Sequence, residues 1–251
     1  MRPIVFLHIP KTAGQTIHHA LGAMVGARNI SPIRVNEQAK DGNTLPPGYL
    51  LHSGHLDWTD LEQVEGDPFV FSVLRDPGER IGSFYFYMRN KAKAASEAEV
   101  EQRIGLQRIR EQSADDYFFG GDEKWQGFIR SMYFNFYCSY FATRMVRGHR
   151  HLRGLSGTQF IDRAFAGTDA IARLYRVENL VALEDDIERL YGHRIRVAGH
   201  HVNTGDHRPE ERRWPKLLAR LERDDSIRRL QTFLTEDEAL IARLDAAGRL
   251  I

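Results

Sequence analysis

The first sixteen residues contain the pattern that most restricts the possible folds. A β-branched apolar run from Ile4 to Ile9 leads into a loop that contains Lys11 and Gly14, and a helical pattern opens at Thr16. A strand, a tight loop and a helix start predict an α/β unit whose free N–H groups and helix dipole would face an anion. The loop is not a Walker A sequence, because Lys11 precedes its only glycine. We therefore expect a phosphate or sulfate site, the alternative being an ordinary strand-to-helix turn.

A second segment repeats this arrangement. Phe69 to Leu74 predicts a strand buried on both faces, Arg75 stands at its carboxyl end, and a helical stretch from about Glu79 through Arg89 contains Ser83. Open α/β sheets bind their ligands at the carboxyl ends of the strands. A guanidinium fork and a hydroxyl suit a doubly charged phosphate monoester.

Together these segments resemble a known family. The run Pro10-Lys11-Thr12-Ala13-Gly14-Gln15-Thr16 is similar to the 5′-phosphosulfate loop of sulfotransferases, and the run from Val73 to Tyr85 is similar to their 3′-phosphate motif. The resemblance is greatest to the carbohydrate branch, the heparan sulfate and uronyl 2-O-sulfotransferases. It implies transfer of a sulfuryl group from 3′-phosphoadenosine 5′-phosphosulfate (PAPS) to an acceptor hydroxyl, with adenosine 3′,5′-bisphosphate (PAP) as the product and no metal.

The resemblance also implies roles for single residues. The loop from Pro10 to Thr16 would hold the phosphosulfate, with Lys11 neutralising the leaving oxygen, while Arg75 and Ser83 would bind the 3′-phosphate. A later polar loop would close over the nucleotide, and our candidates there are Asn203 and Arg208. A metal site is the competing interpretation of that loop, because it also contains His200, His201, Asp206 and His207. These residues lack a regular ligand spacing, so we expect none.

A histidine supplies the expected catalytic base. Gly54-His55 matches the Gly-His of the 2-O-sulfotransferase branch, so the resemblance makes His55 the base. A neutral imidazole titrates close to working pH and can take the proton of an attacking hydroxyl. That branch often has a second histidine two positions earlier, whereas His52 lies three positions earlier, so its role stays open. We expect His8 to be packed within the first strand and His18 to be solvated or at the edge of the core.

Length and composition fit one enzyme domain. A chain of 251 residues can bury one substantial core, and we expect a single sulfotransferase domain over 1–251. The expected fold class is α/β: a P-loop-like three-layer α/β/α arrangement with a central, mostly parallel sheet and helical insertions. Formal net charge is +1, so nothing global indicates nucleic acid. With one cysteine, Cys138, and no leader or membrane-spanning run, we expect a cytoplasmic, bacterial protein.

The remaining pattern predicts further elements. We expect an irregular excursion from about Ile30 to Gly48, and a buried strand over Ala170 to Val177. The predicted helices are Gln15 to about Met24, a short one from Thr59 to Val64 capped by Thr59 or Asp57, a surface helix from Glu97 to Arg110, an aromatic core stretch from Trp125 to Met145, Glu178 to Tyr191, and two amphipathic helices over 211–251. The last two could form a homodimer surface.

Two questions stay open at this stage. The basic segment from Arg144 to Arg153 is either a solvated loop or an attractor of an acidic acceptor such as a uronate-containing glycan. The activity has two rivals: a P-loop nucleotide kinase, which would need a carboxylate such as Asp76 for magnesium, and a nucleotide-binding or glycan-binding module without catalysis. We expect a carbohydrate or other hydroxyl acceptor, whose identity the sequence does not specify.

Overall fold

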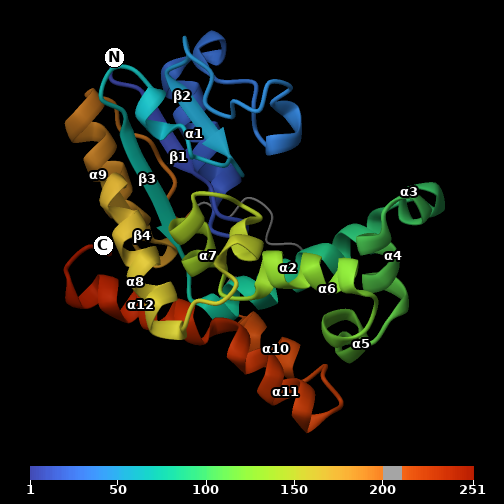
Figure 1. The fold of residues 1–251 in the computed structure, drawn as a ribbon. Coiled ribbons are helices and arrows are strands. Elements are labelled where there is room, and N and C mark those ends of the chain that lie inside the picture. The colour runs from blue at the N-terminus through green and yellow to red at the C-terminus, as the bar shows by residue number, and fades with distance from the viewer. Residues whose placement is uncertain (200–210) are drawn as a thin grey trace.

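The structure, a computed structural model, describes residues 1–199 and 211–251. Its centre is a sheet of four parallel strands in the order β2-β1-β3-β4 (Figure 1). The strands are β1 (Ile4–Leu7), β2 (Leu51–Gly54), β3 (Phe69–Leu74) and β4 (Arg173–Arg176). β1, β2 and β3 are entirely buried, as parallel strands covered on both faces must be, whereas β4 has an exposed first residue, Arg173.

Alternate residues of the strands pack against two different helical layers. Ile4 and Phe6 of β1 face α1 (Gly14–Val25) and α9 (Leu180–Tyr191). Val5 and Leu7 face α7 (Phe136–Thr143), α8 (Gly157–Gly167) and α12 (Thr235–Ala246). The predicted three-layer α/β/α class is therefore confirmed.

A third apolar cluster lies beside the sheet, within a lobe of helices (Figure 1). The long helix α2 (Pro77–Ala94) connects the carboxyl end of β3 to this lobe. The other helices of the cluster are α3 (Glu97–Gln102), α4 (Ile104–Glu111), α5 (Ala114–Phe119), α6 (Glu123–Tyr133), α10 (Arg213–Leu218) and α11 (Asp224–Gln231). The predicted helical insertions correspond to this lobe.

Several predicted elements were wrong in number or extent. The expected strand near Ala170 to Val177 is β4, but β2 had not been predicted as a strand. The expected surface helix is divided into α3 and α4, and the aromatic stretch into α6 and α7, with Asn135 between them at a left-handed φ of 43°. The C-terminal region has three helices where two were expected.

Smaller differences concern the ends and faces of helices. The predicted helix near Thr59 is a single 3-10 turn, Leu61–Gln63, and neither Thr59 nor Asp57 caps it, because its N-cap residue is Asp60. Ile104, inside the expected surface helix, is 56% exposed. Leu217, Leu230, Leu240 and Leu244 of the C-terminal helices are buried in the chain's own core. None of the helices in the described part of the chain is long and apolar enough to cross a membrane.

Candidate functional site

The carboxyl edge of the sheet gathers most of the residues singled out in the sequence. The connection that leaves β1 leads to β2 on one side of the sheet, and the connection that leaves β3 leads to β4 on the other side. The two connections therefore diverge at the carboxyl ends of β1 and β3. Such a divergence is where ligands enter open α/β sheets. His8 follows β1, His55 follows β2 and Arg75 follows β3 at this edge.

The loop after β1 has a backbone suited to an anion. Lys11 and Ala13 adopt left-handed φ values of 74° and 63°, although neither is glycine. Alternation of left-handed and right-handed residues turns successive N–H groups toward one point. Ala13 is also the N-cap residue of α1, and it has no side chain that could occupy the first N–H groups of the helix. The loop therefore turns backbone donors toward the place where the sequence predicted an anion.

The conformation of the loop is also stabilised by contacts of Thr12 and Gly14. The Thr12 hydroxyl is buried and donates to the carbonyl of Ile9 at 2.9 Å. This hydroxyl therefore holds the loop together, and Thr12 would contribute to an anion site through its N–H. A Cβ on Gly14 would lie 1.7 Å from Nε2 of His8, so only glycine fits beneath that imidazole.

Lys11 lies in a strongly positive environment. Burial first, and then the nearby charges of Arg213 and Arg75, lower the pKa of its ammonium to about 8. Its Nζ lies 4.2 Å from the centre of the Tyr87 ring, a cation–π contact with a side chain of α2. Lys11 is therefore held beside the site, and it is predominantly charged at neutral pH.

In the run from Arg75 to Arg80, some side chains lie at the site and others stabilise the fold. Asp76 accepts from the N–H of Glu79 at 2.8 Å and caps α2, and Pro77 occupies the first turn. Arg80 is fully buried, lies 4.7 Å from the centre of the Phe136 ring and donates to the carbonyl of Met132. Arg80 thus ties α2 to the helices beyond it.

Arg75 itself remains at the edge of the sheet. Its backbone is gripped by the Tyr137 phenol, which donates to its carbonyl at 2.8 Å and accepts from its N–H at 3.2 Å. Its guanidinium lies 3.6 Å from a carboxylate oxygen of Glu79. The guanidinium is largely buried, and its charge contributes to the lowered pKa of Lys11.

Arg213 is a site residue that the sequence reasoning missed. Its Nη1 donates to the hydroxyl of Ser83 at 3.2 Å, and its charge acts on both Lys11 and Arg75. It begins α10, which Glu79 caps by accepting from the N–H groups of Arg213 and Trp214 at 2.9 and 3.2 Å. Ser83 and Arg75, paired in the sequence analysis, thus meet around an arginine far away in the chain. No local pattern could have revealed this contact.

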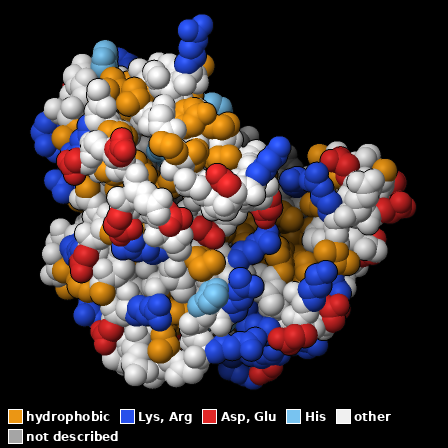
Figure 2. Space-filling model, turned by 45° about the horizontal axis from the view of Figure 1, so that its top comes forward, with side chains coloured by type: hydrophobic (Ala, Val, Ile, Leu, Met, Phe, Trp, Pro, Cys, Tyr) orange, Lys and Arg blue, Asp and Glu red, His pale blue; other side chains and the backbone are white. Residues whose placement is uncertain are grey.

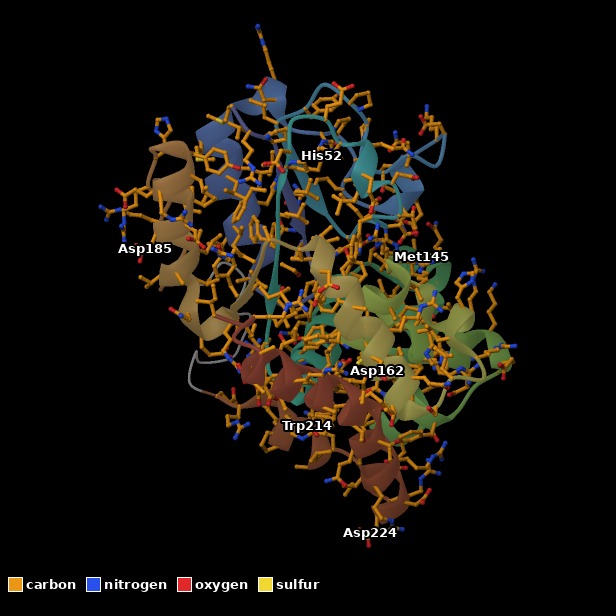
Figure 3. The ribbon with its side chains drawn as sticks, turned by 60° about the vertical axis from the view of Figure 1, so that its left-hand side comes forward. His52, Met145, Asp162, Asp185, Trp214 and Asp224 are labelled. Atoms are coloured by element: carbon orange, nitrogen blue, oxygen red, sulfur yellow. The ribbon has the colours of Figure 1, made fainter. Side chains whose placement is uncertain are left out.

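Two glycines of α2 let α10 pack closely against it. A Cβ on Gly82 would lie 2.7 Å from the backbone carbon of Arg213, and a Cβ on Gly78 would lie 2.8 Å from the Trp214 ring. Gly78 and Gly82 are four residues apart, on one face of α2. Figure 3 shows Trp214 among the C-terminal helices, well away from His52 on the sheet. Arg213 therefore reaches Ser83 because α2 has no side chain at these two positions.

His55 is held in the tautomer that a base requires. Its Nδ1 lies 2.6 Å from the carbonyl oxygen of His8, which can only accept, so Nδ1 carries the hydrogen and Nε2 of the neutral ring keeps its lone pair. Its own N–H donates to the carbonyl of Arg34 at 2.9 Å. Burial lowers the pKa of His55, with smaller contributions from the charges of Arg34 and Lys11. The ring is therefore neutral, and able to accept a proton, at pH 7.

The other histidines near the sheet have different surroundings. His8 is buried, as expected, and its ring centre lies 4.3 Å from that of His55, while burial and nearby positive groups hold its pKa well below the usual range. His52 lies inside β2 and is 1% exposed; burial lowers its pKa to about 4. His52 is therefore a core residue and not a second base. His18 is half-buried on α1.

The remaining predicted residues fall into three groups. Pro10 and Thr16 are buried within the loop and first turn, and Gln15 is exposed there. Asn203 and Arg208 lie outside the described residues, as do the histidines considered for a metal. Within residues 1–199 and 211–251 there is no cluster of three or more metal-ligating side chains.

The basic segment after α7 is engaged with acidic side chains. Arg144 pairs with Glu62 and lies over the Trp58 ring, and Arg147 pairs with Glu37 at 3.2 Å. These contacts hold the segment against residues that precede and follow β2. They favour the structural interpretation of Arg144 and Arg147 over the attraction of an acidic acceptor.

No protein-family model matches this sequence, and no curated protein matches it either.

Proposed function

We propose that this chain is a PAPS-dependent sulfotransferase that transfers a sulfuryl group to a hydroxyl, on a carbohydrate or glycoconjugate. The observation that carries the proposal is the convergence of Lys11, Arg75 and Arg213 at the carboxyl ends of β1 and β3, with the Ser83 hydroxyl among them. Three positively charged side chains that act on one another, with Glu79 beside Arg75, suit a ligand with several negative charges.

The two halves of the site suit the two ends of such a donor. The N–H groups of the loop from Pro10 to Gly14 would bind the phosphosulfate, and the Lys11 ammonium would neutralise the phosphate oxygen as it leaves sulfur. Arg75, Arg213 and Ser83 would bind the 3′-phosphate. Nucleotides without that phosphate would leave these groups unsatisfied, which supports selectivity against ATP.

His55 supplies the remaining step. In the proposed reaction the acceptor oxygen forms a bond to sulfur, the bond between sulfur and the bridging phosphate oxygen breaks, and Nε2 of His55 takes the hydroxyl proton. Its hydrogen bond to the carbonyl of His8 would stabilise the imidazolium that results. Sulfuryl transfer, like phosphoryl transfer, depends mainly on such positioning and electrostatics.

The kinase alternative receives less support from the local contacts. It would need a carboxylate free to hold magnesium next to the phosphate loop. Asp76 instead caps α2, and Glu79 caps α10 and pairs with Arg75. These two carboxylates are thus already used to position the chain.

Calorimetry of nucleotide binding tests the proposal. We expect PAP to bind more tightly than ADP or ATP without magnesium, and Arg75→Gln to weaken PAP binding at least about tenfold, because a charge-assisted hydrogen bond contributes roughly 1.5–3 kcal/mol. Arg173→Gln is the matched control, since Arg173 starts β4 at the opposite edge of the sheet. Equal or tighter binding of ATP, or an unchanged affinity in Arg75→Gln, would overturn the proposal.

A further inference from the structure

A fourth cation stands on the other side of His55. Arg34 lies in the excursion after α1, where Val35 pairs with His55 as a parallel bridge on the side of β2 that faces away from β1. Along the carboxyl edge the order is therefore the Arg34 segment, His55, the end of β1 and then Arg75 at the end of β3. Arg34 and Arg75 are on opposite sides of the proposed base.

The Arg34 guanidinium is half-buried, and no carboxylate among residues 1–199 and 211–251 compensates its charge. Its Nε is shielded from solvent and has no hydrogen-bond partner among the residues that the structure describes. Burial lowers its pKa, and no described carboxylate counteracts this effect. The titratable groups that its charge acts on are His8, His18 and His55, all bases. A cation placed this way is unfavourable unless an anion completes the site.

The backbone of Arg34 has a separate role. Its carbonyl accepts from the N–H of His55, and it lies so close to Gly54 that a Cβ there would be 2.2 Å from it. These contacts hold the segment against β2 whatever side chain residue 34 carries. The guanidinium is therefore not needed to place the segment.

We propose that Arg34 binds an oxyanion of the acceptor substrate, a carboxylate, sulfate or phosphate group near the hydroxyl that is sulfated. This inference rests on the proposed function, because that function assigns the opposite side of His55 to the nucleotide. The charges of Arg75 and Arg213 act on Lys11, whereas the charge of Arg34 acts on His18. Lys11 and Arg34 both act on His8 and His55. An anion at Arg34 would thus bring the hydroxyl of the same molecule to His55. The acceptor is accordingly acidic, and Arg34 determines this specificity in place of the ion-paired Arg144 and Arg147.

The test monitors the imidazole resonances of His18 and His55 by NMR, with saturating PAP in the donor site. The probes are methyl β-D-glucuronide, glucose 6-sulfate, glucose 6-phosphate and the neutral methyl β-D-glucoside. We expect at least one anionic probe to shift both resonances in a saturable way, and the glucoside to shift neither. The anionic probe that binds most tightly identifies the kind of oxyanion.

Two variants keep the test specific. Arg34→Gln should weaken the anionic probe about tenfold or more, since a charge-assisted bond is lost, while its affinity for PAP stays unchanged. Arg28→Gln is the matched control, because Arg28 is an exposed arginine of the same connection and the variant should behave as wild type. Equal binding of the glucoside, or undiminished binding in Arg34→Gln, would overturn the inference.

The two proposals fail in distinguishable ways. If PAP does not bind but the anionic probes still depend on Arg34, the oxyanion site stands and the donor assignment falls. If PAP binds as expected and no anionic probe shifts the two histidines, the donor assignment stands and the inference about Arg34 falls.

Discussion

At the scale of single residues, the carboxyl edge of the sheet brings three positively charged side chains together. Lys11, Arg75 and Arg213 act unfavourably on one another, and part of each side chain is removed from water. Residues in such an arrangement are retained for a ligand more readily than for stability. The protonation state of Lys11 should then affect how tightly that ligand binds.

The affinity for PAP should decrease at alkaline pH because of Lys11. Its pKa of about 8 in the free protein means that the ammonium is lost as pH rises above 8, and an anion then loses one partner. Calorimetry between pH 6.5 and 9.5 should show a fall in affinity that starts near pH 8. Lys11→Gln should bind more weakly at pH 7 and lack this fall; a wild-type affinity that is constant to pH 9.5 would contradict the assignment.

Removal of the imidazole at residue 55 should abolish most of the turnover. We expect His55→Ala to lower kcat about a hundredfold or more, the loss typical of one group that acts in the transition state. PAP binding should be unaffected, since His55 is placed on the acceptor side. The assay is PAP release from PAPS with acidic and neutral carbohydrate acceptors, and His151→Ala, an exposed histidine, is the control. Near-normal turnover in His55→Ala would remove this residue from the mechanism.

At the scale of elements, the sequence predicted the site's parts better than their assembly. The strand–loop–helix at Ile4 to Thr16 and the strand before Arg75 are local patterns, and both were recognised. The short strand β2 was not predicted, because its polar His52 and Ser53 interrupt the apolar run although both are buried. Arg213 reaches Ser83 only through the packing of α10 on α2, which no spacing within either segment encodes.

An alanine at residue 82 should separate these two helices. Gly82→Ala would place a methyl group 2.7 Å from the backbone of Arg213, and overpacking of this kind typically costs about 1–3 kcal/mol. Helix propensity alone would favour alanine by up to about 1 kcal/mol. We therefore expect both a lower free energy of unfolding in urea and weaker PAP binding.

Gly127→Ala is the control for that substitution. Gly127 is also inside a helix, α6, but a Cβ there meets nothing within 4 Å. This variant should be as stable as wild type or slightly more stable, with unchanged PAP affinity. If Gly82→Ala behaved in the same way, close packing of α10 would not be what positions Arg213.

At the scale of the whole molecule, the fold hides several neutral histidines around its sheet. His8, His18, His52 and His55 all have pKa values below 6.5 because of burial. A histidine whose pKa is lowered in the folded state binds protons better when the chain unfolds. Stability that is present above pH 6.5 is therefore lost as the pH falls toward the lowered values.

Mild acid should consequently destabilise the protein. For His52 alone, a pKa of about 4 in the folded state predicts a loss of about 2 kcal/mol between pH 7 and pH 5. Urea unfolding should show a lower free energy of unfolding at pH 5 than at pH 7, although Asp237, whose pKa burial raises to about 6, offsets part of the loss. His52→Gln should show a smaller decrease. His151→Gln should follow wild type; a wild-type stability that does not fall by pH 5 would refute this account.

The placement of Glu79 has a consequence for which ions the site can accept. In the free protein this carboxylate already lies 3.6 Å from Arg75 and accepts from the N–H groups that begin α10. A ligand that binds Arg75 must compete with Glu79, so it must attract the guanidinium more strongly than this carboxylate does. Chloride and other singly charged ions gain little by that exchange, whereas a dianion with oxygens for both arginines gains more. In the proposed site Glu79 would thereby favour binding of a dianion over binding of chloride.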